Sequence, residues 1–205
     1  MARPKVGEID RSSSADKVEK ILQGAMQEFL VHGYAATSMD KVAEAAGVSK
    51  ATVYSHFQDK EGLFRALIER LARKRFHSIL GTQSLVGEPY IVLRRLAKTA
   101  LDQMVNDQEY QAFERLLIGE SARFPELAQV FIGSIAKPAI ETISKYLASR
   151  SELQIPDPEA TARILIGSLV HFVMTQEIMQ GKDIMPMESD RLIDALTHLI
   201  VNCAD

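Results

Sequence analysis

The chain has 205 residues, with 24 lysines and arginines against 27 aspartates and glutamates, and this net charge of −3 excludes a uniformly basic nucleic-acid-binding protein. Its one cysteine, Cys203, excludes an intrachain disulfide, and the five histidines lack metal-site spacing, so we expect no metal and no cofactor. No apolar run has the length of a membrane span and the N-terminus is too polar for a signal peptide, which favours a cytoplasmic protein without a membrane partner.

The charge is unevenly distributed along the chain. Residues 1–76 contain 13 basic and 10 acidic side chains, whereas the remainder contains 11 and 17. This difference suggests two parts with different partners.

Residues 1–12 are polar and contain a proline and a glycine, so we predict a mobile N-terminal arm. As an alternative, its basic residues enter a DNA minor groove: Arg3, Lys5 and Arg11.

A helix is predicted to follow this arm. Ser13 and Asp16 have the spacing of a capping box at its start, and Gly33 is a suitable C-terminal stop. Its apolar residues recur at the three- and four-residue spacing of one helical face: Val18, Ile21, Leu22, Ala25, Met26, Phe29 and Leu30.

Two short helices joined by the residues AGVS form a helix-turn-helix pattern. Thr37 or Ser38 caps the first of them, and Gly47 supplies the tight turn at its end. Ser49 then caps a helix that runs to about His56. A fourth helix, capped by Asp59, has an apolar face formed by Leu63, Phe64, Leu67, Ile68 and Leu71.

The helix that begins after Ser49 has an unusually polar surface. Only Val53 and Phe57, four residues apart, are expected to point inward. The outward residues are hydrogen-bond donors and one small residue: Lys50, Ala51, Thr52, Tyr54, Ser55 and His56. Short polar side chains for base edges and donors for phosphates are what a helix needs in the major groove of DNA.

Residues 21–67 resemble the DNA-binding domain of TetR-family transcriptional regulators. The similarity is carried by Phe29, Gly33–Tyr34, Thr37, VAEAAGVS, Thr52, Tyr54, His56–Phe57, Lys60–Glu61 and Leu63. Ala51 and Val53 depart mildly from the family, where many members have glycine and leucine.

The resemblance implies an all-α homodimer that binds double-stranded operator DNA and is released by a small-molecule ligand. It implies a DNA-binding domain over 13–76, with the helix-turn-helix at about 38–57, and a ligand-binding and dimerisation domain over 77–205. By position, the family's DNA contacts fall on Thr37, Ser38, Ser49, Lys50, Ala51, Thr52, Tyr54, Ser55, His56 and Lys60.

The second half has long helical patterns over roughly 88–105, 108–121, 125–149, 157–180 and 188–203, which makes about nine helices in all. Prolines lie at most of the joints, but Pro138 falls inside a pattern and is expected to kink or break it. Residues 115–147 are similar to the C-terminal domain of AefR-like and AcrR-like members, which does not identify the ligand.

Two sets of residues are candidates for the ligand pocket and the dimer interface. The pocket candidates mix aromatic and polar groups: Tyr90, Met104, Tyr110, Phe113, Phe131, His171, Phe172 and Thr175. The interface candidates lie along the last two helices: Ile166, Leu169, Val170, Val173, Leu192, Leu196 and Leu199. For the pocket candidates the alternative is an ordinary core or interface role, and His171 is equally suited to an interface.

The leading hypothesis is therefore a ligand-released, DNA-binding repressor. The alternative is a DNA-binding regulator without a small-molecule inducer, acting as an activator or under the control of a protein partner. An enzyme is disfavoured, because the sequence shows no nucleophile with its base, no phosphate-binding loop and no metal spacing.

Overall fold

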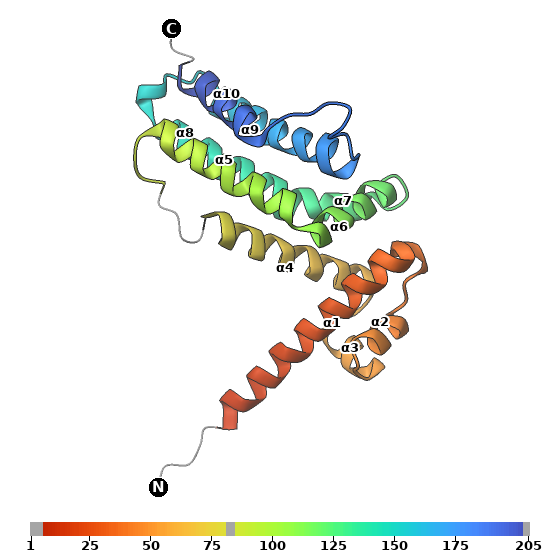
Figure 1. The fold of residues 1–205 in the computed structure, drawn as a ribbon. Coiled ribbons are helices and arrows are strands. Elements are labelled where there is room, and N and C mark those ends of the chain that lie inside the picture. The colour runs from red at the N-terminus through yellow and green to blue at the C-terminus, as the bar shows by residue number, and fades with distance from the viewer. Residues whose placement is uncertain (1–5, 81–84, 203–205) are drawn as a thin grey trace. The chain divides into compact units, whose positions relative to one another are not determined.

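The computed structural model describes residues 6–80 and 85–202, and every regular element in these ranges is helical (Figure 1). The elements are α1 (Val6–Ala36), α2 (Met39–Ala45), α3 (Lys50–His56), α4 (Lys60–Leu80), α5 (Pro89–Asn106), α6 (Gln108–Glu120), α7 (Pro125–Phe131), a π turn (Ile132–Ala136), α8 (Lys137–Ala148), a 3₁₀ turn (Ser151–Leu153), α9 (Pro158–Val173), a second π turn (Met174–Ile178) and α10 (Ser189–Val201). The all-α prediction is confirmed. Within the described ranges, no helix is both long and apolar enough to traverse a lipid bilayer.

The chain divides into two compact units. The first comprises Met1–Arg70 and Leu116–Val130, and the second comprises Leu71–Arg115 and Phe131–Asp205. Helices α4 and α6 each contribute residues to both units. The segment Leu116–Val130 therefore belongs to the helix-turn-helix unit although it lies far along the sequence.

Helix α1 begins at Val6, so the prediction that the helix starts at a capping box of Ser13 and Asp16 is wrong, and residues 6–12 of the predicted arm are helical. Residues 1–5 of that arm, with Arg3 and Lys5, lie outside the described residues. Once the apolar face of α1 has formed a helix, each residue added to that helix gains a backbone hydrogen bond, and no proline lies between Val6 and Ala36 to interrupt it. Gly33 does end the regular helix, with a φ of 76°.

The expected disturbance at Pro138 is confirmed. The pattern predicted as one helix over 125–149 is divided into α7 and α8 by the π turn Ile132–Ala136, and Pro138 lies in the first turn of α8. A proline without an N–H group is tolerated in a first turn, and the wider π turn absorbs the missing hydrogen bond.

The core of the first unit is built on α1, α2 and α4. An aromatic group lies at its centre, where the ring of Phe29 is 5.2 Å from that of Phe64 and 5.6 Å from that of Tyr34. Phe124, from the distant segment, packs on Tyr34 with ring centroids 4.9 Å apart. Helix α2 approaches α1 closely at Gly24, where a β-carbon would meet the backbone nitrogen of Ala46 at 2.8 Å.

We expect the substitution Gly24→Ala to destabilise the protein by on the order of 1 kcal/mol. The added methyl group favours the helix by roughly 0.5–1 kcal/mol, but the clash with backbone atoms costs roughly 1–3 kcal/mol because α2 has to shift. Urea unfolding measures the difference. Gly119→Ala is the matched control, since a β-carbon there meets nothing within 4 Å and should stabilise α6. An equal gain from both substitutions would contradict the close packing of α2 on α1.

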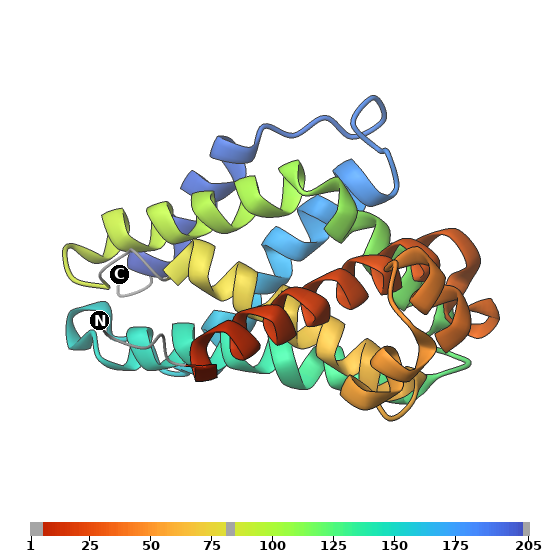
Figure 2. The same ribbon diagram turned by 90° about the horizontal axis from the view of Figure 1, so that it is seen from below.

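The second unit is a bundle in which α5 packs against α9 and α10, and α8 packs against α9. Figure 2 shows α5 and α10 side by side, with a long irregular loop between α9 and α10. The core between them is apolar and includes Val92, Leu93, Leu96, Leu101, Tyr146, Leu147, Leu165, Phe172, Ile193 and Ile200.

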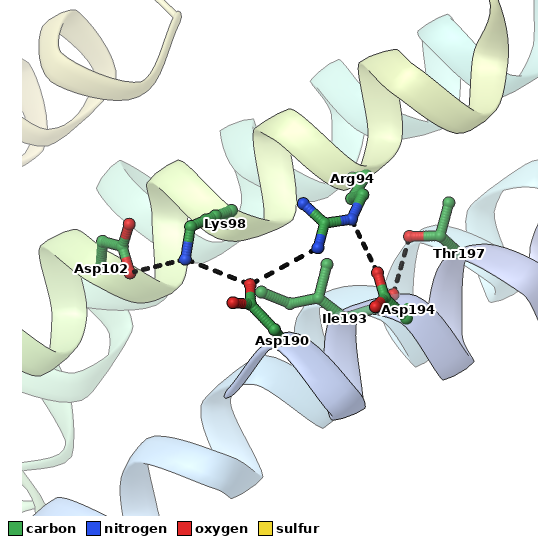
Figure 3. Close-up of polar contacts among 7 residues, drawn as sticks. All are labelled: Arg94, Lys98, Asp102, Asp190, Ile193, Asp194 and Thr197. Carbon is green, nitrogen blue, oxygen red and sulfur yellow. Dashed lines mark hydrogen bonds and ion pairs between the residues drawn. The ribbon is translucent and has the colours of Figure 1, made fainter. Parts of the chain in front are cut away.

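A chain of ion pairs joins α5 to α10 above this core (Figure 3). Arg94 donates to Asp194 at 2.7 Å and lies 3.6 Å from Asp190, which also accepts from Lys98 at 3.1 Å. These side chains are partly or largely exposed, so each pair contributes little stability. Because the basic side chains lie on α5 and their acidic partners are spaced along α10, the ion pairs instead favour one register of α10 on α5.

A buried carboxyl group lies between α4 and α6 in this unit. Burial raises the pKa of Glu114, against the opposing effects of a hydrogen bond to Tyr110 and the charges of Arg75 and Arg115. The Arg75 guanidinium lies 3.5 Å above the ring of Tyr110. Because the folded protein binds this proton more tightly than the unfolded chain, the contribution of Glu114 to stability falls as the pH rises above its unfolded pKa.

We therefore expect Glu114→Gln to stabilise the protein at pH 7.5 relative to the unaltered chain, and to have a much smaller effect at pH 4.5. Glutamine keeps the shape and cannot ionise, so it removes the unfavourable buried charge that forms at the higher pH. Urea unfolding at the two pH values measures the difference. Glu109→Gln, an exposed carboxylate on the same helix, is the control. A pH-independent effect of Glu114→Gln would contradict the prediction.

Candidate nucleic-acid interface

The polar helix predicted from the sequence is α3, and its start is well defined. Gly47 turns the chain with a φ of 64°, and the Val48 amide donates to the Ala43 carbonyl at 3.0 Å. Ser49 is the N-cap: its hydroxyl oxygen accepts from the Thr52 amide at 3.1 Å and lies 2.8 Å from the Thr52 hydroxyl. The helix-turn-helix is therefore a tightly hydrogen-bonded unit.

Two side chains anchor α3 to the unit. Val53 is fully buried and Phe57, at the C-cap, is 9% exposed. The opposite face is open, because Lys50, Ala51, Tyr54, Ser55 and His56 are all exposed. The predicted contrast between an apolar anchor and a polar face is present, with small Ala51 in its middle.

Lys50 is held by an ion pair within this surface. Its ammonium lies 2.7 and 2.8 Å from the two carboxylate oxygens of Asp40, in the first turn of α2, and 5.9 Å from the centre of the Tyr54 ring. The hydrogen bond and the charge of Asp40 raise the pKa of Lys50. Sequence spacing does not indicate this pair, since it joins two residues ten positions apart in different helices.

Ser38 is the exposed N-cap of α2, accepting from the Lys41 amide at 3.3 Å. Thr37, in contrast, is only 2% exposed, and its hydroxyl donates to the carbonyls of Gly33 at 2.8 Å and Glu28 at 3.0 Å. The Thr37 hydroxyl is therefore used to finish α1, which leaves its backbone N–H group as the part of Thr37 that could bind a phosphate, and the contact itself stays a prediction.

Lys60 is also occupied within the protein. Its ammonium donates to the carbonyls of Tyr34 at 2.8 Å, Thr37 at 3.0 Å and Ala35 at 3.2 Å, and it lies 4.5 Å from the Tyr34 ring. Burial lowers the pKa of Lys60, and the carboxylate of Glu120 opposes this effect. An ammonium group has three N–H donors, so all three are used within the protein, which argues against Lys60 as a phosphate contact.

The eight predicted pocket residues do not form one pocket. His171, Phe172 and Thr175 line a cavity of about 600 Å³ in the second unit, together with Gly167, Gln176 and Met185. Phe113 and Tyr110 are instead buried core residues, and Tyr90 packs on His198 with ring centroids 5.1 Å apart. Met104 packs against the core of the bundle, and Phe131 does not line the cavity.

The predicted dimer-interface residues also divide into two sets. Leu169, Val173 and Leu196 are buried in the core of their own chain, so their prediction as interface residues is wrong. Ile166 and Leu192 are half-buried, whereas Val170 and Leu199 are exposed. Ile164, which is not among the predicted residues, is 62% exposed on α9. In α9 and α10, the most apolar side of the helix faces the core of its own chain. The exposed apolar residues lie on the neighbouring side of each helix.

Two family models match the chain. The model of the tetR family of bacterial regulatory proteins matches residues 21–67, which contain the helix-turn-helix. The model of the AefR-like transcriptional repressor C-terminal domain matches residues 91–203, more than half of the chain.

Individual relatives agree with these models. The HTH-type transcriptional regulator YhgD of Bacillus subtilis (strain 168) is 25% identical over 195 residues, which cover 92% of this chain and 96% of YhgD. The transcriptional repressor ComR of Escherichia coli (strain K12) is 46% identical over 68 residues, which are 33% of this chain and 28% of ComR. The similarity to ComR thus concerns about a quarter of that protein.

A solved structure extends the likeness to the whole fold. The flavonoid-responsive regulator FrrA superimposes with a TM-score of 0.77 at 28% identity, over 91% of this chain and 96% of FrrA. From the helix-turn-helix, the two family models and the whole-chain similarity, we conclude that this chain belongs to the TetR family, whose members are DNA-binding transcriptional regulators rather than enzymes.

Proposed function

We propose that this protein is a homodimeric repressor that leaves its operator when a small molecule binds. The observation that carries the proposal is α3, whose outward face is polar and exposed while Val53 and Phe57 hold it to the unit. The proposed contacts are Ser38, Ser49, Lys50, Ala51, Thr52, Tyr54, Ser55 and His56. Because its partner is operator DNA, we place its action in the cytoplasm.

The dimer is supported by three exposed apolar side chains on the last two helices, which together make up the proposed dimer strip. Ile164 and Val170 on α9 and Leu199 on α10 are each at least 41% exposed, and small Gly167 lies between the first two. Large apolar side chains on a monomer surface mark a contact site, and small residues let helices approach. A two-fold axis through this strip gives two copies of α3, as a palindromic operator requires.

A ligand site is supported by the cavity beside His171, whose volume of about 600 Å³ falls in the range of small-molecule pockets. Its lining combines apolar Ile164, Phe172 and Met185 with the polar groups of His171 and Thr175. Since Ile164 belongs to both the cavity and the proposed dimer strip, a ligand there changes how the two copies meet. A changed dimer alters the spacing of the two α3 helices, and the ligand thereby shifts the population away from the DNA-binding form.

The test uses the full chain and DNA selected by that chain from a random-sequence pool. We expect a particle of twice 22.8 kDa by light scattering, and an enriched palindromic sequence bound with salt-sensitive affinity in fluorescence anisotropy. The absence of any enriched sequence would rule out the proposed DNA-binding role.

Release is tested with a panel of flavonoids, chosen because FrrA is a flavonoid-responsive regulator, together with other small apolar molecules. A repressor should lose operator affinity when at least one of these molecules is added. Expression of a reporter gene placed behind the operator should rise when the repressor is removed. An activator, or a regulator controlled by a protein partner, shows the opposite reporter response or no release by any small molecule.

A further inference from the structure

The surface proposed to meet DNA contains an acidic side chain that the proposed contacts do not use. Asp40 lies in the first turn of α2 and Lys50 is the first residue of α3, and both carboxylate oxygens of Asp40 lie within 2.8 Å of the Lys50 ammonium. Both side chains are largely exposed, at 61% and 59%. A cation of the surface proposed to meet DNA is therefore neutralised within the protein.

The Asp40–Lys50 pair affects binding to non-operator DNA and to the operator in different ways. A phosphate that approaches loosely meets a neutral pair, gains little attraction and is repelled by Asp40 at short range. An exposed ion pair is also weak enough to be exchanged for a phosphate when the surrounding fit is good. Sequence-independent affinity depends on the number of cations that neutralise phosphates, so masking one cation weakens non-operator binding most.

Resting on the proposed function, we propose that Asp40 is a specificity-determining residue that keeps Lys50 from phosphates on non-operator DNA and yields it only when α3 is seated on the operator. Asp40 acts through Lys50 and is a positioning residue. An acidic residue in a first helical turn also stabilises that helix through its dipole, and this ordinary role has to be separated from the proposed one.

The experiment compares Asp40→Asn, Lys50→Met, the double variant and the unaltered full chain. Glu44→Gln removes the same charge from an exposed position of α2, whereas Lys50 is paired with Asp40, and it is therefore the matched control. Each protein is titrated by fluorescence anisotropy against the selected operator and a scrambled duplex of the same composition, over about 50–200 mM salt.

We expect Asp40→Asn to bind the scrambled duplex about 5- to 10-fold more tightly, with a salt slope steeper by about 0.9, which corresponds to one more neutralised phosphate. Operator affinity should rise by less than about threefold, since Lys50 already contacts DNA there. Glu44→Gln should change neither affinity by more than about twofold, since it is not paired with Lys50. In the Lys50→Met background, Asp40→Asn removes only the repulsion between its carboxylate and phosphates. It should raise the two affinities by the same factor, so that the ratio of operator to scrambled-duplex affinity stays unchanged.

Three outcomes overturn the inference while the proposed function stands. The first is an equal effect of Asp40→Asn and Glu44→Gln, and the second is a change in the ratio of operator to scrambled-duplex affinity that Asp40→Asn still causes in the Lys50→Met background. The third is a loss of operator affinity greater than about tenfold, which would mean that Asp40 reads a base. Failure of the unaltered chain to select any operator is a different result. It removes the proposed function itself, and the inference with it.

Discussion

Ala51→Glu is expected to weaken operator binding by at least about 100-fold, which corresponds to about 2.7 kcal/mol of binding free energy, while leaving the protein folded. Ala51 is exposed on the polar face of α3, between side chains that we propose contact DNA. A carboxylate there is brought against phosphates and base edges, and such like-charge contacts cost several kcal/mol. Anisotropy titration of the selected operator measures the loss, and urea unfolding checks the fold.

Two controls separate charge at this position from other causes. Ala51→Gln adds nearly the same volume without a charge and should lose far less affinity. Gln103→Glu makes the same change of net charge on an exposed position of α5 and should bind within about twofold of the unaltered chain, because distant surface charges are screened. If Ala51→Glu binds the operator as well as Ala51→Gln does, α3 does not face DNA.

Lys60→Met should destabilise the protein by about 2–3 kcal/mol. The ammonium of Lys60 satisfies three carbonyls at the end of α1 and lies over the Tyr34 ring, and hydrogen bonds from a charged donor contribute roughly 1.5–3 kcal/mol each. Water replaces part of this loss because the Ala35 end of the site is exposed. Methionine keeps most of the apolar stem, so urea unfolding reports mainly the lost polar contacts.

Lys60→Met also separates the structural role of Lys60 from the role in DNA binding that the family resemblance implied. Lys41→Met removes an exposed lysine of α2 and should change stability by less than about 0.5 kcal/mol. Under conditions where Lys60→Met is fully folded, its operator affinity and salt slope should match those of the unaltered chain. Unchanged stability together with a salt slope reduced by about 0.9 would show instead that Lys60 neutralises a phosphate.

Local features were predicted well because a few neighbouring residues decide them. Gly33 and Gly47 adopt positive φ angles where the chain turns, Ser38, Ser49 and Asp59 cap the helices that follow them, and the π turn beside Pro138 lies where a proline was expected to disturb the helix. Caps and turns depend on groups within three or four residues, so the order of the sequence already contains their geometry.

The site predictions were less accurate for side chains that can contact either other groups of the same chain or an outside partner. Thr37 and Lys60 have suitable donors for phosphates, yet both use them on the carbonyls at the end of α1. Leu169, Val173 and Leu196 have the spacing of an interface stripe, but the same spacing describes a core stripe. Periodicity shows that a helix has an apolar face and does not say what covers that face.

The sequence by itself determined the all-α class, the helix-turn-helix and the exposed polar face of α3, since these follow from local spacing, caps and turn residues. Only the tertiary structure decided that Lys50 is paired with Asp40, that Glu120 accepts the Tyr34 amide from 86 residues away at 3.1 Å, and which apolar stripe of α9 remains exposed. Each of these depends on which surfaces of different helices meet. Packing settles that choice through the summed burial of many side chains, which no short stretch of residues contains.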